Sequence, residues 1–246
     1  MTLPTPERPS GRVFRARDGV GRFVRRACRN PVGQNPGVTD DRTRIRRLPE
    51  KAATTRADLD AVLDAARVAH VAFVHDGAPV NIPTACARDG DRLLLHGSTG
   101  SRMMRVLATG VPVCVTLTLL DGMVLARSAF ESSMHYRSAV ICGSAAPVAD
   151  QVPALRAMSE AWMPGRWDTL RPPTAKELAA TLVLELPLEE WSVKISAGDP
   201  DDPPEDLDEP VWAGVLPIAT AYGEPIPAPD LRGDPPLPDY LADWKP

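Results

Sequence analysis

Short runs in which hydrophobic and polar residues alternate occupy the middle of the chain and predict β-strands. The pairs Asp76-Gly77 and Asp121-Gly122, and the stretch 88–91, separate neighbouring runs as the tight turns of hairpins do. Six mostly antiparallel strands of this kind favour a closed or nearly closed barrel. The expected strands cover residues 71–74, 80–86, 92–96, 111–119, 123–130 and 136–147.

Apolar positions also recur at helical spacing before, between and after these strands. Thr55 with Asp58, and Thr174 with Glu177, have the spacing of helix caps. We expect the elements after residue 147 to pack outside the barrel, so the fold class is mainly β with peripheral helices (α+β). These further elements are helices over 54–66, 101–109, 152–162 and from Thr174, and two short strands over 182–186 and 191–195.

Charge is distributed unevenly and divides the chain into regions. Residues 1–47 contain 12 arginines and 4 acidic residues, a net charge of +8, so the remainder carries −12 of the total of −4. We expect a disordered arginine-rich leader over 1–47 and a barrel domain over 48–197. An acidic, proline-rich linker then covers 198–210, and an extension over 211–246 is expected to dock back on the barrel.

Composition also excludes several classes of partner and site. The leader lacks the stacking aromatic residues of a nucleic-acid module, so we do not expect nucleic-acid binding. No signal peptide or apolar stretch of roughly 18 residues is present, which favours a cytoplasmic protein that does not enter membranes. The four cysteines are far apart and form no C-x-x-C pair, so no metal site is expected.

The segment from Gly97 to Ser101 is the strongest chemical signal. This glycine-bracketed polar turn ends an apolar run and opens an expected helix that carries Arg102 and Arg105. Amide N–H groups at a helix start are unpaired and carry partial positive charge, so an anion over Ser101 would meet amides, a hydroxyl and a guanidinium. The alternative is a capped turn without a ligand.

Several motifs, in order, resemble the pyridoxamine 5′-phosphate oxidase-like flavin-binding split barrels, in particular the branch near nitroimidazole-resistance proteins. The resemblance implies a six-stranded antiparallel split β-barrel and a homodimer with FMN at the subunit interface. It places the FMN phosphate at Ser101 and Arg102 and the flavin ring along Ile82, Pro83 and Thr84. The motifs are Asp76-Gly77-x-Pro79, Ile82-Pro83, Leu95–Arg102, Val111–Thr116 and Leu125–Ser138.

Other residues around these motifs complete the expected site. Ser98 and Arg105 flank the phosphate turn, and His96 precedes it, where it could face the ribityl chain or the phosphate. Arg127 and Arg137 lie in apolar strand patterns, so each either forms an ion pair or contacts a ligand. Tyr136 and Arg137 are further cofactor-binding candidates, and His135 could donate a proton to a substrate or to reduced flavin.

The chain departs from the oxidase branch of this family at two points. Met103 replaces a lysine after Ser101-Arg102, which removes one cationic phosphate contact unless Arg105 or Arg137 compensates. The C-terminus lacks an arginine motif that grips a substrate phosphate, which disfavours oxidation of vitamin B6 phosphates. We therefore expect an FMN-dependent oxidoreductase that acts on an unidentified small molecule through flavin N5.

Two alternatives remain open. One is a related barrel that binds haem or a deazaflavin, with His75, His96 or His135 as candidate haem ligands. The other is a non-catalytic flavin-binding or regulatory module.

Overall fold

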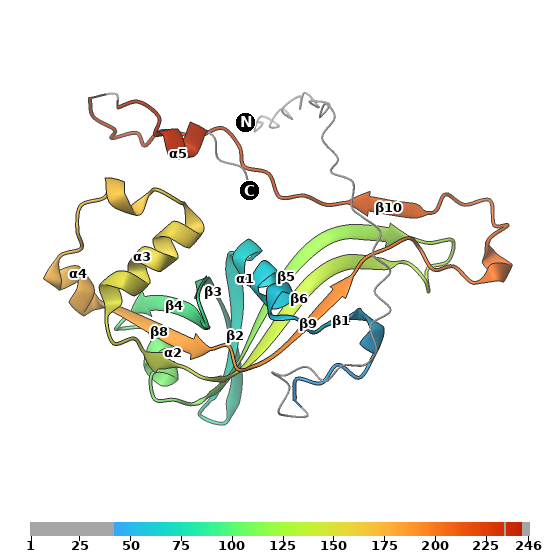
Figure 1. Cartoon of the computed structure of the whole chain (residues 1–246), viewed down its shortest axis with the longest axis horizontal. Coiled ribbons are helices and arrows are strands. Elements are labelled where there is room, and N and C mark those ends of the chain that lie inside the picture. The colour runs from blue at the N-terminus through green and yellow to red at the C-terminus, as the bar shows by residue number, and fades with distance from the viewer. Residues whose placement is uncertain (1–41, 234, 243–246) are drawn as a thin grey trace, which may run out of the picture. The chain divides into compact units, whose positions relative to one another are not determined.

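Figure 1 presents the chain as a computed structural model that describes residues 42–233 and 235–242. Most of the expected leader, residues 1–47, therefore lies outside the described residues. The described part is dominated by one antiparallel sheet with helices packed against it, in agreement with the expected fold class.

The sheet holds ten strands instead of the six expected, in the order β1-β9-β6-β5-β2-β3-β4-β8-β7, with β10 paired to β5. Every pairing is antiparallel. Within the described ranges no pairing joins the end strands β1 and β7, so the hydrogen-bonded ring of a closed barrel is not seen. The strands are β1 (Ala52–Ala53), β2 (Val68–His75), β3 (Ala78–Asp89), β4 (Arg92–Ser98), β5 (Pro112–Leu125), β6 (Ser133–Ser144), β7 (Ala146–Pro147), β8 (Thr181–Pro187), β9 (Glu190–Ser196) and β10 (Gly214–Pro217).

Helices cover both faces of this sheet. The predicted caps are confirmed, because Thr55 and Thr174 each accept a hydrogen bond from the amide three residues later and form a capping box. One face of α1 is buried with the inward residues of β2, β4, β5, β6 and β9 in the main core. The helices are η1 (Pro49–Lys51), α1 (Arg56–Ala65), α2 (Arg102–Leu107), α3 (Gln151–Trp162), η2 (Trp167–Thr169), α4 (Ala175–Ala180), η3 (Pro204–Asp206) and α5 (Asp239–Ala242).

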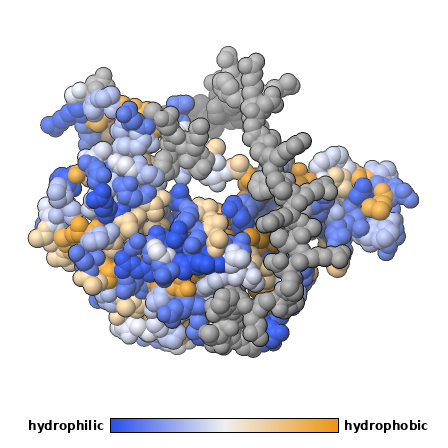
Figure 2. Space-filling model, viewed as in Figure 1, coloured by the Kyte–Doolittle hydropathy of each residue, from blue (hydrophilic) through white to orange (hydrophobic). Residues whose placement is uncertain are grey.

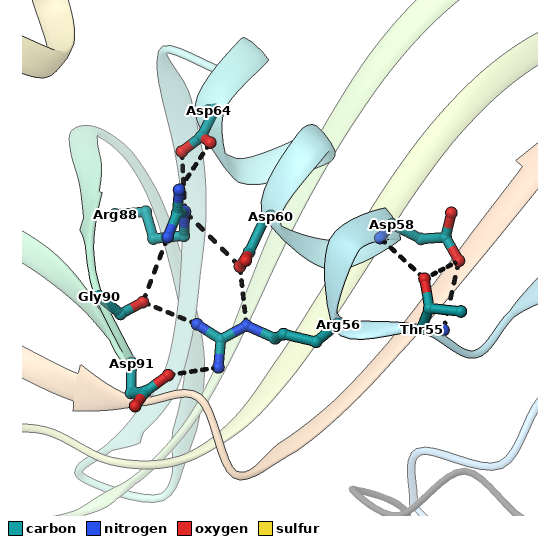
Figure 3. Close-up of polar contacts among 8 residues, drawn as sticks. All are labelled: Thr55, Arg56, Asp58, Asp60, Asp64, Arg88, Gly90 and Asp91. Atoms are coloured by element: carbon teal, nitrogen blue, oxygen red, sulfur yellow. Dashed lines mark hydrogen bonds and ion pairs between the residues drawn. The ribbon is translucent and has the colours of Figure 1, made fainter.

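A network of charges fixes α1 to the β3–β4 hairpin (Figure 3). Arg56 donates to Asp60 at 2.7 Å and to Asp91 at 2.6 Å. Arg88 of β3 pairs with both carboxylate oxygens of Asp64, at 2.8 and 2.7 Å. Each of these two arginines is therefore paired with carboxylates and holds the helix to the hairpin.

The prediction of a hairpin at Asp121-Gly122 is wrong. β5 continues through this pair to Leu125, and the register with β6 shifts between Leu120 and Gly122, as at a β-bulge. The long ladder on both sides holds the dipeptide extended and overrides its local turn preference. The connection to β6 instead lies between residues 125 and 133, so β5 and β6 form one long ribbon (Figure 1).

The two short runs expected outside the barrel are also strands of the sheet. β8 pairs with β4 over its full length, from Thr181 opposite Ser98 to Pro187 opposite Arg92. β9 pairs with β6 from Glu190 to Ser196. Both strands are apolar, and their backbone N–H and C=O groups need hydrogen-bond partners. The free edges of β4 and β6 provide those partners.

The C-terminal region is attached to the β5–β6 ribbon and to the α3 region at separate points. β10 pairs with residues 122–125 of β5. Before it, the Asp202 carboxylate is only 1 % exposed and accepts hydrogen bonds from the amide and Nη1 of Arg127 at 2.7 and 2.8 Å. Further on, Arg166 donates to the Tyr240 hydroxyl at 2.7 Å.

Candidate functional site

The predicted phosphate turn lies between β4 and α2. Ser101 is the N-cap residue of α2, and its hydroxyl accepts a hydrogen bond from the Met104 amide at 3.4 Å. Met104 is fully buried and packs against Gly97, where a Cβ atom would lie 2.8 Å from the Met104 Cγ. Gly97 is therefore required for α2 to pack closely on the end of β4.

Most amides of the turn are already bonded within the chain. The Thr99 amide donates to the Ala180 carbonyl at 3.0 Å, and the Ser101 amide to the Ser98 carbonyl at 2.9 Å. The Gly100 amide donates to the Ser98 hydroxyl at 3.1 Å. Because few free amides remain at this turn, an anion bound here must be held mainly by side chains. The sequence had suggested a larger contribution from the amides.

A cavity of about 560 Å³ that is widely open to solvent lies against the exposed side of α2, which follows the turn. Its volume is in the range of small-molecule sites. Arg102 and Arg105, three residues apart on α2, both line it, but Ser98 and Ser101 do not. The lining residues are Val74, His75, Asp76, Arg102, Arg105, Val106, Thr109 and Val111.

Arg102 and Arg105 differ from the other arginines of the barrel in their partners. Within the described ranges, neither guanidinium has a hydrogen bond or an ion pair, whereas Arg92, Arg127 and Arg137 all pair with carboxylates. Two neighbouring, unpaired guanidiniums on a cavity wall attract an anion, and a phosphate is the ligand best matched to their fork geometry. This cavity is the candidate functional site.

Sequence reasoning missed His75 and Asp76 as part of a cavity wall. They form the β2 side of the β2–β3 turn, and Asp76 and Gly77 adopt the positive φ angles, 52° and 75°, of a tight hairpin. His75 Nε2 lies 3.5 Å from the Asp76 carboxylate. The Asp76-Gly77 motif predicts this turn correctly, but its proximity to α2 follows only from the folded chain.

The three candidates on β3 face opposite sides of the sheet. Ile82 and Thr84 are paired with Val71 and Ala69, which are both fully buried, so these two side chains face the core. Pro83 is exposed and lies opposite His70, which in turn lies opposite Thr116 of β5. Only Pro83 of the three is therefore presented on the outer face of the sheet. His96, at the end of β4, is also exposed.

The candidates on β6 lie far from the cavity in the same chain. Tyr136 is opposite Leu120, nine residues along β5 from the cavity residue Val111, which is about 30 Å of extended strand. His135 is opposite Gly122, still further along. Hence one chain brings together Arg102 and Arg105 with the β2–β3 turn, but not with His135, Tyr136 or Arg137.

Arg137 forms an ion pair. Its Nε and Nη2 donate to the two oxygens of Asp121 at 2.9 and 2.8 Å, and this bond raises the pKa of the guanidinium. The β-bulge supplies the partner, because Asp121 is the extra residue at the shift in register. Arg127 is likewise paired, with Asp202.

Two absences apply to the described ranges. No helix there is both long enough and apolar enough to span a bilayer. No three histidine, cysteine or acidic side chains of that part of the chain gather as ligands of a metal ion.

Residues 55–195, which include the candidate cavity and most of the sheet, match the family model described as pyridoxamine 5′-phosphate oxidase. The chain belongs to this family. The match spans more than half of the chain and confirms the resemblance noted from its motifs. No curated protein matches the chain.

Two solved structures of this oxidase-like family are similar to the chain over most of its length. The FAD and haem binding protein of Mycobacterium smegmatis is 47 % identical, with 78 % of this chain and 96 % of that chain covered and a TM-score of 0.76. The flavocytochrome Anf3 of Azotobacter vinelandii is 37 % identical, with 85 % and 99 % covered and a TM-score of 0.80.

A 5-nitroimidazole antibiotic resistance protein of Bacteroides thetaiotaomicron is more distant. It is 18 % identical, with 58 % of this chain and 86 % of that chain covered and a TM-score of 0.50. It shares the fold of the oxidase-like family, and the chain is more similar to the two proteins above.

Proposed function

We propose that the protein is a flavin-dependent redox protein that holds FAD and haem. The single observation that supports this most is the 47 % identity to the M. smegmatis FAD and haem binding protein, 96 % of which is covered. This replaces the FMN expected from the sequence with FAD and favours the haem alternative. When bound, a flavin exchanges electrons singly or in pairs and a haem exchanges them singly, so together they can pass electrons between different donors and acceptors.

The cavity beside α2 fits the phosphate part of a flavin. Arg102 and Arg105 present two positive charges that form no ion pair within the described residues, although Asp76 lines the same cavity, and a dinucleotide pyrophosphate carries two negative charges. The hydroxyls of Ser98 and Ser101 accept hydrogen bonds from amides and keep their own protons free to donate. Two guanidiniums also compensate for Met103, which stands where the oxidase branch has lysine.

The flavin site is completed by a second copy of the chain. Within one chain, about 30 Å of extended strand lies between the cavity and Tyr136, so we assign the ribbon residues beside this flavin to another protomer. The ribbon carries large apolar side chains that are each more than 40 % exposed, as expected of a surface that packs on a partner. Figure 2 shows that hydrophobic and hydrophilic residues are mixed on the face of the molecule viewed there. The exposed apolar side chains of the ribbon are Leu120, Met123, Leu125 and Met134.

A haem ligand must come from few residues if it is a histidine. The whole chain has four histidines, at positions 70, 75, 96 and 135. His75 alone of the four lines the candidate cavity, and Val74 and Val111 of the same wall offer apolar surface to a haem ring away from the α2 arginines assigned to the flavin phosphates. We therefore assign His75 first and place His70, on the open face of the sheet, second.

The test is the absorbance spectrum of the purified protein, followed by chromatography of the released flavin. FAD together with a haem Soret band supports the proposal, and FMN alone or a colourless protein that takes up neither group overturns it. His75→Ala should abolish the Soret band and keep the flavin bands, while His96→Ala retains both. Loss of the Soret band in His70→Ala but not in His75→Ala would assign the haem ligand to His70 instead.

The proposal that two copies of the chain share the flavin site is tested by measuring molecular mass in solution and flavin content on the same variants. Met123→Glu puts a charge on the exposed apolar ribbon, and we expect it to give a monomer that loses flavin. Val152→Glu, at an exposed apolar position of α3, is the control and should remain dimeric. A monomeric wild-type protein with a full complement of flavin would refute the shared site.

A further inference from the structure

Cys114 of β5 and Cys142 of β6 lie directly opposite each other in the sheet. Directly opposed residues point to the same face, which here is the outer one, because Val113, Val115 and Ile141 on the alternate positions are buried in the main core. Cys142 is 9 % exposed and Cys114 is more accessible. The outer face of the sheet therefore carries a pair of facing thiols.

The separation of opposed strand residues is close to that of a disulfide. Their Cβ atoms lie about 4.5–5.5 Å apart, and a disulfide requires about 3.5–4.5 Å. A backbone adjustment of about 1 Å or less thus suffices to join them. The two thiols are close enough to hydrogen-bond, and burial, followed by the neighbouring Cys114, raises the pKa of Cys142.

The third cysteine of the described ranges provides a contrast. Cys86 lies opposite Leu95 in β3–β4 and is 1 % exposed, so it has neither a thiol partner in register nor access to solvent. Burial raises its pKa to about 11, which keeps it a thiol at neutral pH. Cys28 lies outside the described residues.

We propose that Cys114 and Cys142 are a peroxide-oxidisable dithiol that closes to a disulfide. The Cys114 thiolate attacks hydrogen peroxide, so that a S–O bond forms, the O–O bond breaks and hydroxide leaves to become water. The Cys142 thiol then attacks the sulfur of the Cys114 sulfenic acid and gives up its proton to the departing hydroxyl, so that the S–S bond forms and the second oxygen leaves as water. In sum, two thiols are oxidised by two electrons, peroxide is reduced to two waters, and a thiol reductant reverses the change.

The roles of the two cysteines follow from exposure. Cys114 meets peroxide first because it is the more accessible thiol, and Cys142 resolves the intermediate from the facing strand. The proposal does not depend on which cofactor the protein holds. An experiment that refutes the disulfide therefore leaves the proposed function untouched, and the reverse also holds.

The experiment treats the full-length Cys28→Ser protein, with its cofactors as isolated, with a small excess of hydrogen peroxide. Free thiols are then blocked with iodoacetamide, and peptides are mapped by mass spectrometry. We expect a linked Cys114–Cys142 peptide and an alkylated Cys86. After reduction with dithiothreitol, Cys114 and Cys142 should both be fully alkylated. In Cys142→Ser the Cys114 sulfenic acid should persist and react with dimedone at least tenfold more than in the parent.

Three results would overturn the proposal. They are unchanged thiols at excess peroxide, a Cys114 sulfinic acid beside a free Cys142 thiol, or oxidation of Cys86 to the same extent as Cys114. Each variant is compared at equal flavin and haem content, and Cys86→Ser, which leaves the pair intact, should behave as the parent.

Discussion

Replacing Arg102 with alanine tests the assignment of the cavity as a phosphate site. The substitution removes one guanidinium from the cavity wall and leaves Arg105 three residues away on the same helix. A hydrogen bond to a charged group is worth about 1.5–3 kcal/mol, or roughly 10- to 150-fold in affinity. Because Arg102 is exposed and Arg105 remains, we expect the lower end, about tenfold weaker flavin binding.

The assay titrates the flavin-free protein with FAD and follows the quenching of flavin fluorescence. The double variant Arg102→Ala/Arg105→Ala should bind more than 100-fold more weakly than the wild type, and the wild-type affinity should fall as salt is raised. Arg156→Ala is the control, since Arg156 is an exposed arginine of α3 that pairs with Asp168. If both single variants bind FAD within twofold of the wild type, the phosphate assignment is refuted.

Two further substitutions and one pH titration test contacts that hold the fold together. Gly97→Ala places a Cβ atom 2.8 Å from Met104 Cγ, so denaturant unfolding should show a loss of about 1–3 kcal/mol together with weaker flavin binding. Asp202→Ala leaves the partly buried Arg127 guanidinium unpaired and should cost about 1–3 kcal/mol in the same assay. The pKa of Glu177 is lowered to about 2, so its stabilising effect is complete above its ordinary value of 4.5 and is lost as pH falls towards 2, which carboxyl NMR titration measures.

Each of the two substitutions has a matched control, and the titration has its own contradicting outcome. Gly223→Ala has open space around the new methyl group and should be neutral, whereas equal losses at Gly97 and Gly223 would contradict the packing argument. Asp201→Ala, at the exposed position next to Asp202, should change stability by less than 0.5 kcal/mol. A Glu177 carboxyl that titrates near 4.5 would rule out its hydrogen bonds to Arg171 and to the helix cap.

Local chemistry explains the elements that the sequence predicted well. The Asp76-Gly77 hairpin and the caps at Thr55 and Thr174 depend on φ preferences and hydrogen bonds within four residues, and all three are confirmed. The helix after Ser101 also begins where the polar turn indicated. Asp121-Gly122 has equally strong local turn chemistry, yet the β5–β6 ladder on both sides keeps it extended.

The amino-acid sequence by itself determined the family, the antiparallel character of the fold and the pair of arginines on α2, because these depend on motifs and on residues close together in the chain. Tertiary structure alone decided that His75 lines the same cavity as those arginines, that Ile82 and Thr84 face the core, and that Arg137 forms an ion pair with Asp121. Those outcomes depend on which strands pair and in what register. Register is fixed by contacts between residues tens of positions apart, and a one-residue change in it would turn every side chain to the opposite face.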